Sequence, residues 1–96
     1  MRIVRLRLSV RGPFPCGEIK EEVYARSDPE DMLEHLYVET CAGRAELVFF
    51  LHEDIRGSAE VTVLRLWRRV TSRDPSWRTW SVLEVGSIRD IDPGKA

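Results

Sequence analysis

The sequence predicts a small α+β domain in which two helices cover one face of a mostly antiparallel sheet. Three patterns carry this prediction. Residues 4–10 alternate between apolar and polar side chains, as a strand with one buried face does. Residues 47–51 form a continuous apolar run that is typical of a strand covered on both faces. Residues 57–73 place apolar side chains along one stripe of a helix.

The chain length sets the domain organisation. Ninety-six residues suffice for one hydrophobic core but not for two. We therefore expect one α+β domain over residues 1–88 and a polar C-terminal tail over residues 89–96.

After the first strand, glycines and prolines between residues 12 and 17 indicate a loop. Two interpretations of residues 18–26 then compete. Ile19, Val23 and Ala25 favour a second strand, because the short loop would let it pair with the first strand as a hairpin. Glu21 falls on the same face and weakens that interpretation, so a short helix is the alternative.

A helix of about four turns is expected next. Ser27 and Glu30 have the spacing of a capping box, and Pro29 suits a first helical turn. Gly43 is a natural stop. The apolar positions at helical spacing are Met32, Leu33, Leu36, Tyr37 and Cys41, and His35 lies off this stripe.

The second half of the chain is expected to form a strand, a helix and a strand. The β-branched residues 61–63 would suit a strand within 57–73, but the apolar stripe there runs for about three turns and favours a helix capped by Ser58. Pro75 ends it, and residues 80–85 alternate as a last strand. This architecture resembles a variant of the ferredoxin-like α+β sandwich, although no family motif accompanies it.

Charge and composition restrict the classes of partner. The net charge of −1 argues against a dedicated nucleic-acid binder. No stretch approaches the roughly 20 apolar residues of a membrane helix, and no secretory signal is visible, so we expect a cytoplasmic protein. Thirteen arginines against two lysines are typical of a GC-rich genome, such as that of a high-GC bacterium.

Charges also cluster along the chain. Residues 1–11 and 56–78 are basic, whereas residues 18–39 are acidic. These blocks would either form a two-signed surface or neutralise one another between neighbouring elements, and we favour the second interpretation.

Few residues suggest chemistry. Cys16 and Cys41 lack the spacing of a zinc site, and we expect neither metal nor cofactor. We place Cys16 in a loop and Cys41 near a helix end. His52 precedes two carboxylates and could act as a general base, but consecutive side chains on an extended chain point in alternating directions. A solvated turn is therefore the favoured interpretation, and any catalytic residues are unknown.

Two tryptophans are the other binding candidates. Trp77 and Trp80 lie three residues apart at the start of the last expected strand, so one should be buried and the other exposed. An exposed tryptophan beside Arg78 is typical of a protein interface, and it could also stack on a planar ligand. The candidate binding residues are Trp77, Trp80, Arg78 and His52.

Three functions remain open, and whether the chain is an enzyme is uncertain from its sequence. The favoured hypothesis is a non-enzymatic accessory or protein-interaction domain that self-associates as a homodimer, because a second copy would cover the apolar strand. The alternative is a small ferredoxin-like dimeric enzyme or ligand-binding protein with a pocket between sheet and helices, involving His52, Tyr24 or Tyr37, and Trp80. A nucleic-acid binder that uses the arginines is the weakest, and no membrane partner is expected.

Overall fold

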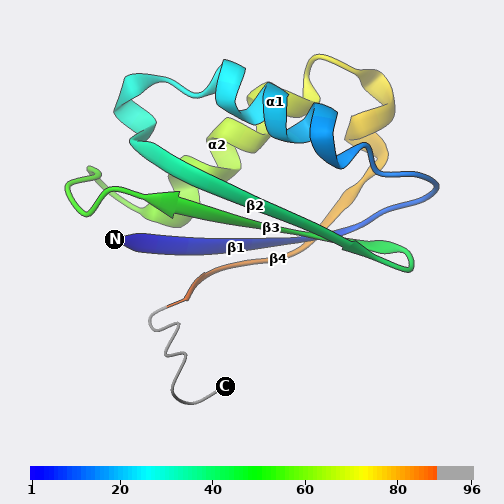
Figure 1. Cartoon of the computed structure of the whole chain (residues 1–96), viewed down its shortest axis with the longest axis horizontal. Coiled ribbons are helices and arrows are strands. Elements are labelled where there is room, and N and C mark those ends of the chain that lie inside the picture. Colours follow the sequence, from blue (N-terminus) through cyan, green and yellow to red (C-terminus); the bar gives the residue numbers. More distant parts are fainter. Residues whose placement is uncertain (89–96) are drawn as a thin grey trace.

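In the computed structural model, which describes residues 1–88, two helices lie on one face of a four-stranded antiparallel sheet (Figure 1). The strands lie in the order β2-β3-β1-β4 across the sheet. The elements are β1 (Arg2–Ser9), α1 (Cys16–Arg26), β2 (Leu33–Cys41), β3 (Arg44–Leu51), α2 (Ala59–Thr71) and β4 (Ser81–Ile88), with one short 3₁₀ helix before β2 (Pro29–Asp31) and another before β4 (Pro75–Thr79). The expected α+β class is thereby confirmed, and the expected tail over residues 89–96 lies outside the described residues.

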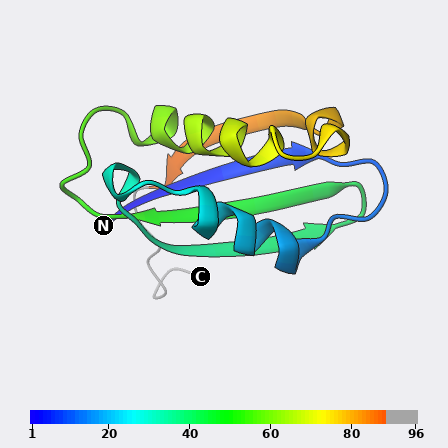
Figure 2. The same ribbon diagram turned by 90° about the horizontal axis from the view of Figure 1, so that it is seen from above.

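The core lies between the sheet and the two helices, which run side by side above it (Figure 2). β1 places its even-numbered side chains on this side, where Val4 is paired with Phe49 of β3 and Leu6 with Leu47, all without solvent exposure. The helices add fully buried aliphatic side chains from above: Ile19 and Val23 from α1, and Val63, Leu66 and Val70 from α2.

The strand preferred for residues 18–26 is wrong, because this segment is the helix α1. Ile19 and Val23 are four residues apart and therefore share one helical face, which is buried on the sheet. Glu21 lies on the exposed side of the helix, so its polarity no longer conflicts with the burial of its neighbours.

The helix expected to begin after Ser27 is also wrong, because residues 33–41 form the strand β2. The capping box exists, but Asp28 and Asp31 form it, and it caps only the single 3₁₀ turn before β2. Leu33 and Leu36 suggested a helix by their spacing of three. The register of β2 on β3 shifts between Leu33 and His35, and this extra residue lets both leucines contact the core from a strand.

Met32 ends the 3₁₀ turn in the left-handed backbone region, with φ of 50°. A residue with a Cβ atom pays about 1 kcal/mol for this conformation, whereas glycine does not. The Met32 side chain is 38% exposed, so little packing is lost on its removal. We expect Met32→Gly to raise the free energy of unfolding by up to about 1 kcal/mol in urea titrations.

Gly43 provides the matched control, because it has φ of +75° in the β2–β3 turn and a methyl group there would meet no atom within 4 Å. Gly43→Ala should therefore lower the stability by about 1 kcal/mol through the backbone alone. A loss of stability in Met32→Gly would show that the methionine side chain outweighs its backbone strain.

The helix expected within residues 57–73 is confirmed as α2, and Ser58 caps it by accepting a hydrogen bond from the Val61 N–H group. The β-branched residues fit the helix for local reasons. Val61 points into solvent, and the Thr62 hydroxyl donates to the Ser58 carbonyl at 3.1 Å. The strand expected over residues 80–85 corresponds to β4.

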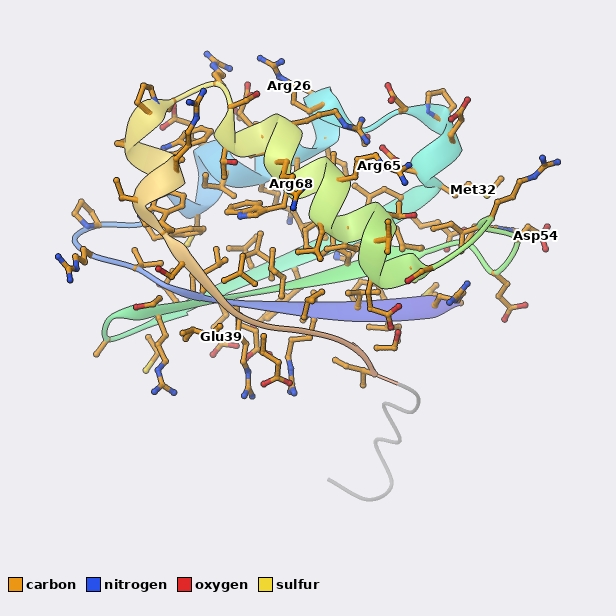
Figure 3. The ribbon with its side chains drawn as sticks, turned by 180° about the vertical axis from the view of Figure 1, so that it is seen from behind. Arg26, Met32, Glu39, Asp54, Arg65 and Arg68 are labelled. Carbon is orange, nitrogen blue, oxygen red and sulfur yellow. The ribbon has the colours of Figure 1, made fainter. Side chains whose placement is uncertain are left out.

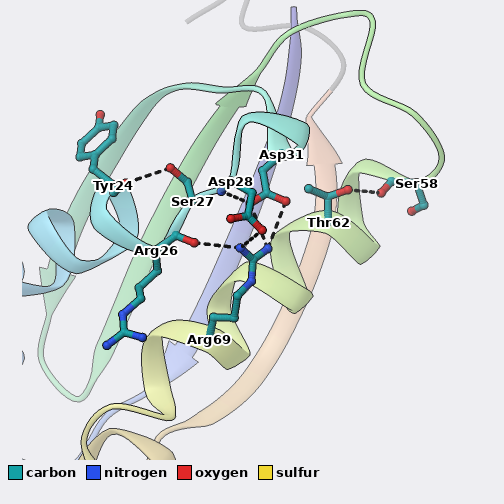
Figure 4. Close-up of polar contacts among 8 residues, drawn as sticks. All are labelled: Tyr24, Arg26, Ser27, Asp28, Asp31, Ser58, Thr62 and Arg69. Atoms are coloured by element: carbon teal, nitrogen blue, oxygen red, sulfur yellow. Dashed lines mark hydrogen bonds and ion pairs between the residues drawn. The ribbon is translucent and has the colours of Figure 1, made fainter.

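An arginine of α2 connects that helix to the end of α1 and to the 3₁₀ helix that follows it (Figure 4). The guanidinium of Arg69 donates to the Arg26 carbonyl at 2.8 Å, to the Asp28 carboxylate at 2.9 Å and to both oxygens of the Asp31 carboxylate, the nearer at 2.9 Å. Asp31 is only 3% exposed. The acidic segment around residues 28–31 is thus neutralised by the basic α2, as the charge pattern led us to expect.

A second ion-pair cluster lies next to the first, because Arg26 takes part in both. The buried carboxylate of Glu22 on α1 accepts hydrogen bonds from Arg26, at 3.3 Å, and from Arg73 beyond α2. Both clusters connect α1 or its exit to α2, so electrostatic contacts supplement the apolar packing of the two helices.

Candidate interaction surface

The face of the sheet opposite the helices is formed by alternate residues of all four strands. Pairing places Arg5 beside Val48 and Val48 beside Tyr37, one step out of phase with the core pairs. Figure 3 shows Glu39 on this side, directed away from the helices. We name the surface the open face, and its members are Ile3, Arg5, Arg7, Ser9, His35, Tyr37, Glu39, Cys41, Arg44, Glu46, Val48, Phe50, Ser81, Glu84, Gly86 and Ile88.

One half of the open face is apolar. Ile3 pairs with Phe50 on one side and with Ile88 on the other. Phe50 also lies 5.7 Å from the ring of His35, measured between ring centroids. Tyr37, in the next row, is 50% exposed. The run in β3 thus does have apolar side chains on both faces, and Phe50 and Val48 supply those of the open face.

The other half of the open face is charged, and Arg5 reaches it from the row of Val48 and Tyr37. Arg7 lies between Glu46, at 3.4 Å, and Glu84, at 3.5 Å, and Arg5 lies 3.4 Å from Glu84. These ion pairs are long and partly exposed, so each contributes little to the stability of the single chain. Glu39 stands directly opposite Glu46 on the neighbouring strand, which places two like charges together.

This charged half contains a hollow of about 510 Å³. Arg7, Glu46 and Glu84 line it together with the exposed side chain of Leu83, which lies where the β1–β4 register shifts. Its walls carry the partly exposed charges of the Arg7–Glu46 and Arg7–Glu84 pairs. It resembles an interface depression more than an enclosed substrate pocket.

The two candidate tryptophans are both buried, Trp77 to 4% exposure and Trp80 to 9%, so the expected exposed member does not exist. The prediction failed because Trp77 lies in the 3₁₀ helix before β4, where residues three apart are on the same side. Their rings stack with centroids 6.0 Å apart, and Trp80 also contacts Phe14 at 4.6 Å. Both tryptophans belong to the core.

The remaining candidates do not join them. Arg78 is exposed and donates to the Ser72 carbonyl at 3.0 Å. His52 follows β3 at the opposite end of the sheet from Trp80, and its Nδ1 atom accepts the Asp54 N–H group at 3.0 Å. That bond belongs to a solvated turn, which the sequence favoured for this segment.

The tyrosines proposed for the enzyme hypothesis also lie apart. The Tyr24 hydroxyl accepts the N–H group of Leu36 at 2.8 Å, on the helix-covered side of the edge strand β2. Tyr37 lies on the open face. Histidine, tyrosine and tryptophan therefore do not converge on one pocket as that hypothesis required.

The structure of residues 1–88 was also compared with the expectations for a metal site, a membrane-spanning helix and the two cysteines. No group of three or more histidine, cysteine, aspartate or glutamate residues there could hold a metal ion. No helix in the same range is long and apolar enough to cross a membrane. Cys16 and Cys41 are both free thiols; Cys16 begins α1, and Cys41 ends a strand and not the helix that we expected.

The perturbed carboxyl groups lie outside the open face and serve local structure. Hydrogen bonds from Ser87 and Ser58 lower the pKa of Glu60 at the start of α2. The N-terminal ammonium group lowers the pKa of Glu53, and hydrogen bonds from Ser76 lower that of Asp74. All three shifts favour the ionised carboxylate, which is typical of capping and turn contacts and not of a general acid.

No family model matches the chain, and a search of curated proteins finds no significant sequence match.

Proposed function

We propose that this protein is a small non-enzymatic interaction domain that self-associates through the open face of its sheet. The observation that carries the proposal is the apolar half of that face. Ile3 pairs with Phe50, Tyr37 lies diagonally from Phe50 in the next row, and no segment within residues 1–88 covers these side chains. A contiguous apolar patch of this kind usually marks an interaction site.

The charges of the open face favour a second copy as the partner. The face has three arginines and three glutamates, so its charge is balanced. A partner of strongly single-signed charge, such as a nucleic acid, gains nothing from a balanced surface. In a two-fold symmetric contact between two copies, an arginine of one copy can face a glutamate of the other, and each such contact occurs twice. The charged members are Arg5, Arg7, Arg44, Glu39, Glu46 and Glu84.

The fold is consistent with this role. The strand and helix order of the chain, strand–helix–strand–strand–helix–strand, is that of ferredoxin-like domains, and we assign the fold as a variant of that architecture. Such a layout leaves one sheet face free, which a second sheet can cover. We also place the domain in the cytoplasm, where the free thiols of Cys16 and Cys41 would stay reduced.

A charged substitution at Phe50 tests the proposal. In Phe50→Asp, a carboxylate replaces an apolar side chain at the centre of the patch, and its burial in a dimer would be costly. We expect the wild type to dimerise in sedimentation velocity experiments and Phe50→Asp to remain monomeric at the same concentration. Circular dichroism should show that the variant is folded.

Val61→Asp is the matched control, because Val61 is 51% exposed on α2, on the other side of the molecule. It should dimerise like the wild type. If Phe50→Asp and Val61→Asp associate equally well, the open face is not the contact surface.

A further inference from the structure

The open face is polarised along its strands. Ile3, Phe50 and Ile88 occupy one end. The row that contains Arg7, Glu46 and Glu84 lies nearer the other end of β1. Two copies can pack face to face about a two-fold axis that runs along the strands or across them. The first places the apolar end of one copy on the apolar end of the other, and the second places it on the opposite end.

From this polarity we infer that the two copies pack with their strands aligned, about a two-fold axis that runs parallel to the strands between β1 and β3. The inference rests on the proposed self-association. An axis across the strands would place Arg7 on Arg5 of the partner subunit and Glu46 on Val48 of the partner subunit. It would bring like charges together and bury a carboxylate against an apolar side chain, and both are costly. An axis along the strands brings the two rows of Ile3, Phe50 and Ile88 together and leaves only Arg5, on Val48 of the partner subunit, as a charge against an apolar side chain. Aligned packing of two sheets is also common.

The position of the axis follows from the strand order. β3 and β1 are the two inner strands, so an axis between them gives the largest overlap of two four-stranded sheets. β1 of one copy then lies over β3 of the other. Ile3 faces Phe50 of the partner subunit, and Tyr37 faces Gly86 of the partner subunit. A Cβ atom at Gly86 would meet nothing within 4 Å, so space exists there for the tyrosine ring.

In the charged row, Arg7 faces Glu46 of the partner subunit, and the contact occurs twice. The long distances from Arg7 to its own Glu46 and Glu84, 3.4 and 3.5 Å, leave the guanidinium free to bind a partner carboxylate. At the edges, Glu39 faces Glu84 of the partner subunit, which opposes association.

The size of the face also points to a weak dimer. Four strands about 4.8 Å apart and eight residues rising about 3.3 Å each give a face of roughly 19 by 26 Å. Such a face lies toward the small end of specific protein interfaces. We therefore expect association that a single reversed charge near the axis can abolish.

Charge reversal in two separate chains tests the axis. Arg7→Glu alone brings the new carboxylate against Glu46 of the partner subunit, and Glu46→Arg alone brings two arginines together. Each homodimer should weaken at least about tenfold, since like charges facing each other across an interface cost several kcal/mol. An equimolar mixture should form the heterodimer, because opposite charges then face each other across the axis. Native mass spectrometry distinguishes the three species.

Crosslinking gives a second measurement that needs neither charged variant to fold. In a Cys16→Ser, Cys41→Ser background, a chain with Ile3→Cys is mixed with a chain with Phe50→Cys and treated with a short bismaleimide. The aligned axis predicts a mixed crosslinked product. The control pairs Ile3→Cys with Ser9→Cys, at the other end of β1, and should give none.

The outcomes separate the two proposals. If the wild type does not dimerise at all, the proposed function fails and this inference fails with it. If the wild type dimerises but Ile3→Cys crosslinks to Ser9→Cys and not to Phe50→Cys, the axis runs across the strands and only the inference is overturned. Failure of the charge-reversed chains to form a heterodimer, when both are folded, also overturns it.

Discussion

Phe49→Ala is expected to cost about 3–5 kcal/mol of folding free energy, whereas Phe50→Ala costs about 1 kcal/mol, although the two residues are adjacent. Phe49 is fully buried on the helix-covered face of β3, where it pairs with Val4 and Leu36. Removing its ring leaves a cavity that these neighbours cannot fill. Phe50 lies on the open face and is only partly buried in the single chain.

The comparison is made by urea unfolding at a concentration low enough to keep the chain monomeric, because Phe50 would also be buried in a dimer. The loss at Phe49 is a large share of the roughly 5–15 kcal/mol typical of such domains, so partial unfolding at about 37 °C is an expected sign. Similar costs for both variants, or a larger cost for Phe50→Ala, would mean that the two faces of β3 are assigned the wrong way round.

Arg69→Ala is the second substitution with a large expected effect, at about 3 kcal/mol of destabilisation. The loss of the guanidinium leaves the buried Asp31 carboxylate with no cation and removes the bond to the Arg26 carbonyl. The connection between α2 and the segment that follows α1 is then lost.

Arg68→Ala is the control, because Arg68 is the exposed neighbour on the same helix and makes no side-chain ion pair within residues 1–88. Its effect should stay within about 0.5 kcal/mol. A double-mutant cycle of Arg69→Ala with Asp31→Ala should give a coupling energy of about 1–3 kcal/mol. An Arg69→Ala effect no larger than that of Arg68→Ala would show that the cluster does not stabilise the fold.

The elements that were predicted correctly are those whose sequence pattern fits only one kind of secondary structure. β1 alternates without interruption, and α2 has an apolar stripe over three turns with Ser58 as its cap. The segment between residues 16 and 41 was assigned in the wrong order for a physical reason. α1 buries only Ile19, Glu22 and Val23, and the spacing of the two apolar residues also suited one face of a strand. The register shift near Leu33 gave β2 the spacing of a helix.

The candidate surface was only partly accessible to sequence reasoning. The continuous apolar run of β3 indicated correctly that both its faces are apolar, and it pointed to a partner. Tyr37 was considered only for an enzyme pocket, and Glu39 was missed. Both fell within the expected helix, and only the sheet register places them beside β3. The tryptophans drew attention by composition, yet their 3₁₀ turn directs both into the core.

Sedimentation velocity of the wild-type chain over a concentration series tests the central claim most directly. Self-association through the open face predicts a reversible shift, with rising concentration, from the 11.1 kDa monomer to a species of twice that mass. A single monomeric species up to the highest attainable concentration would contradict the account.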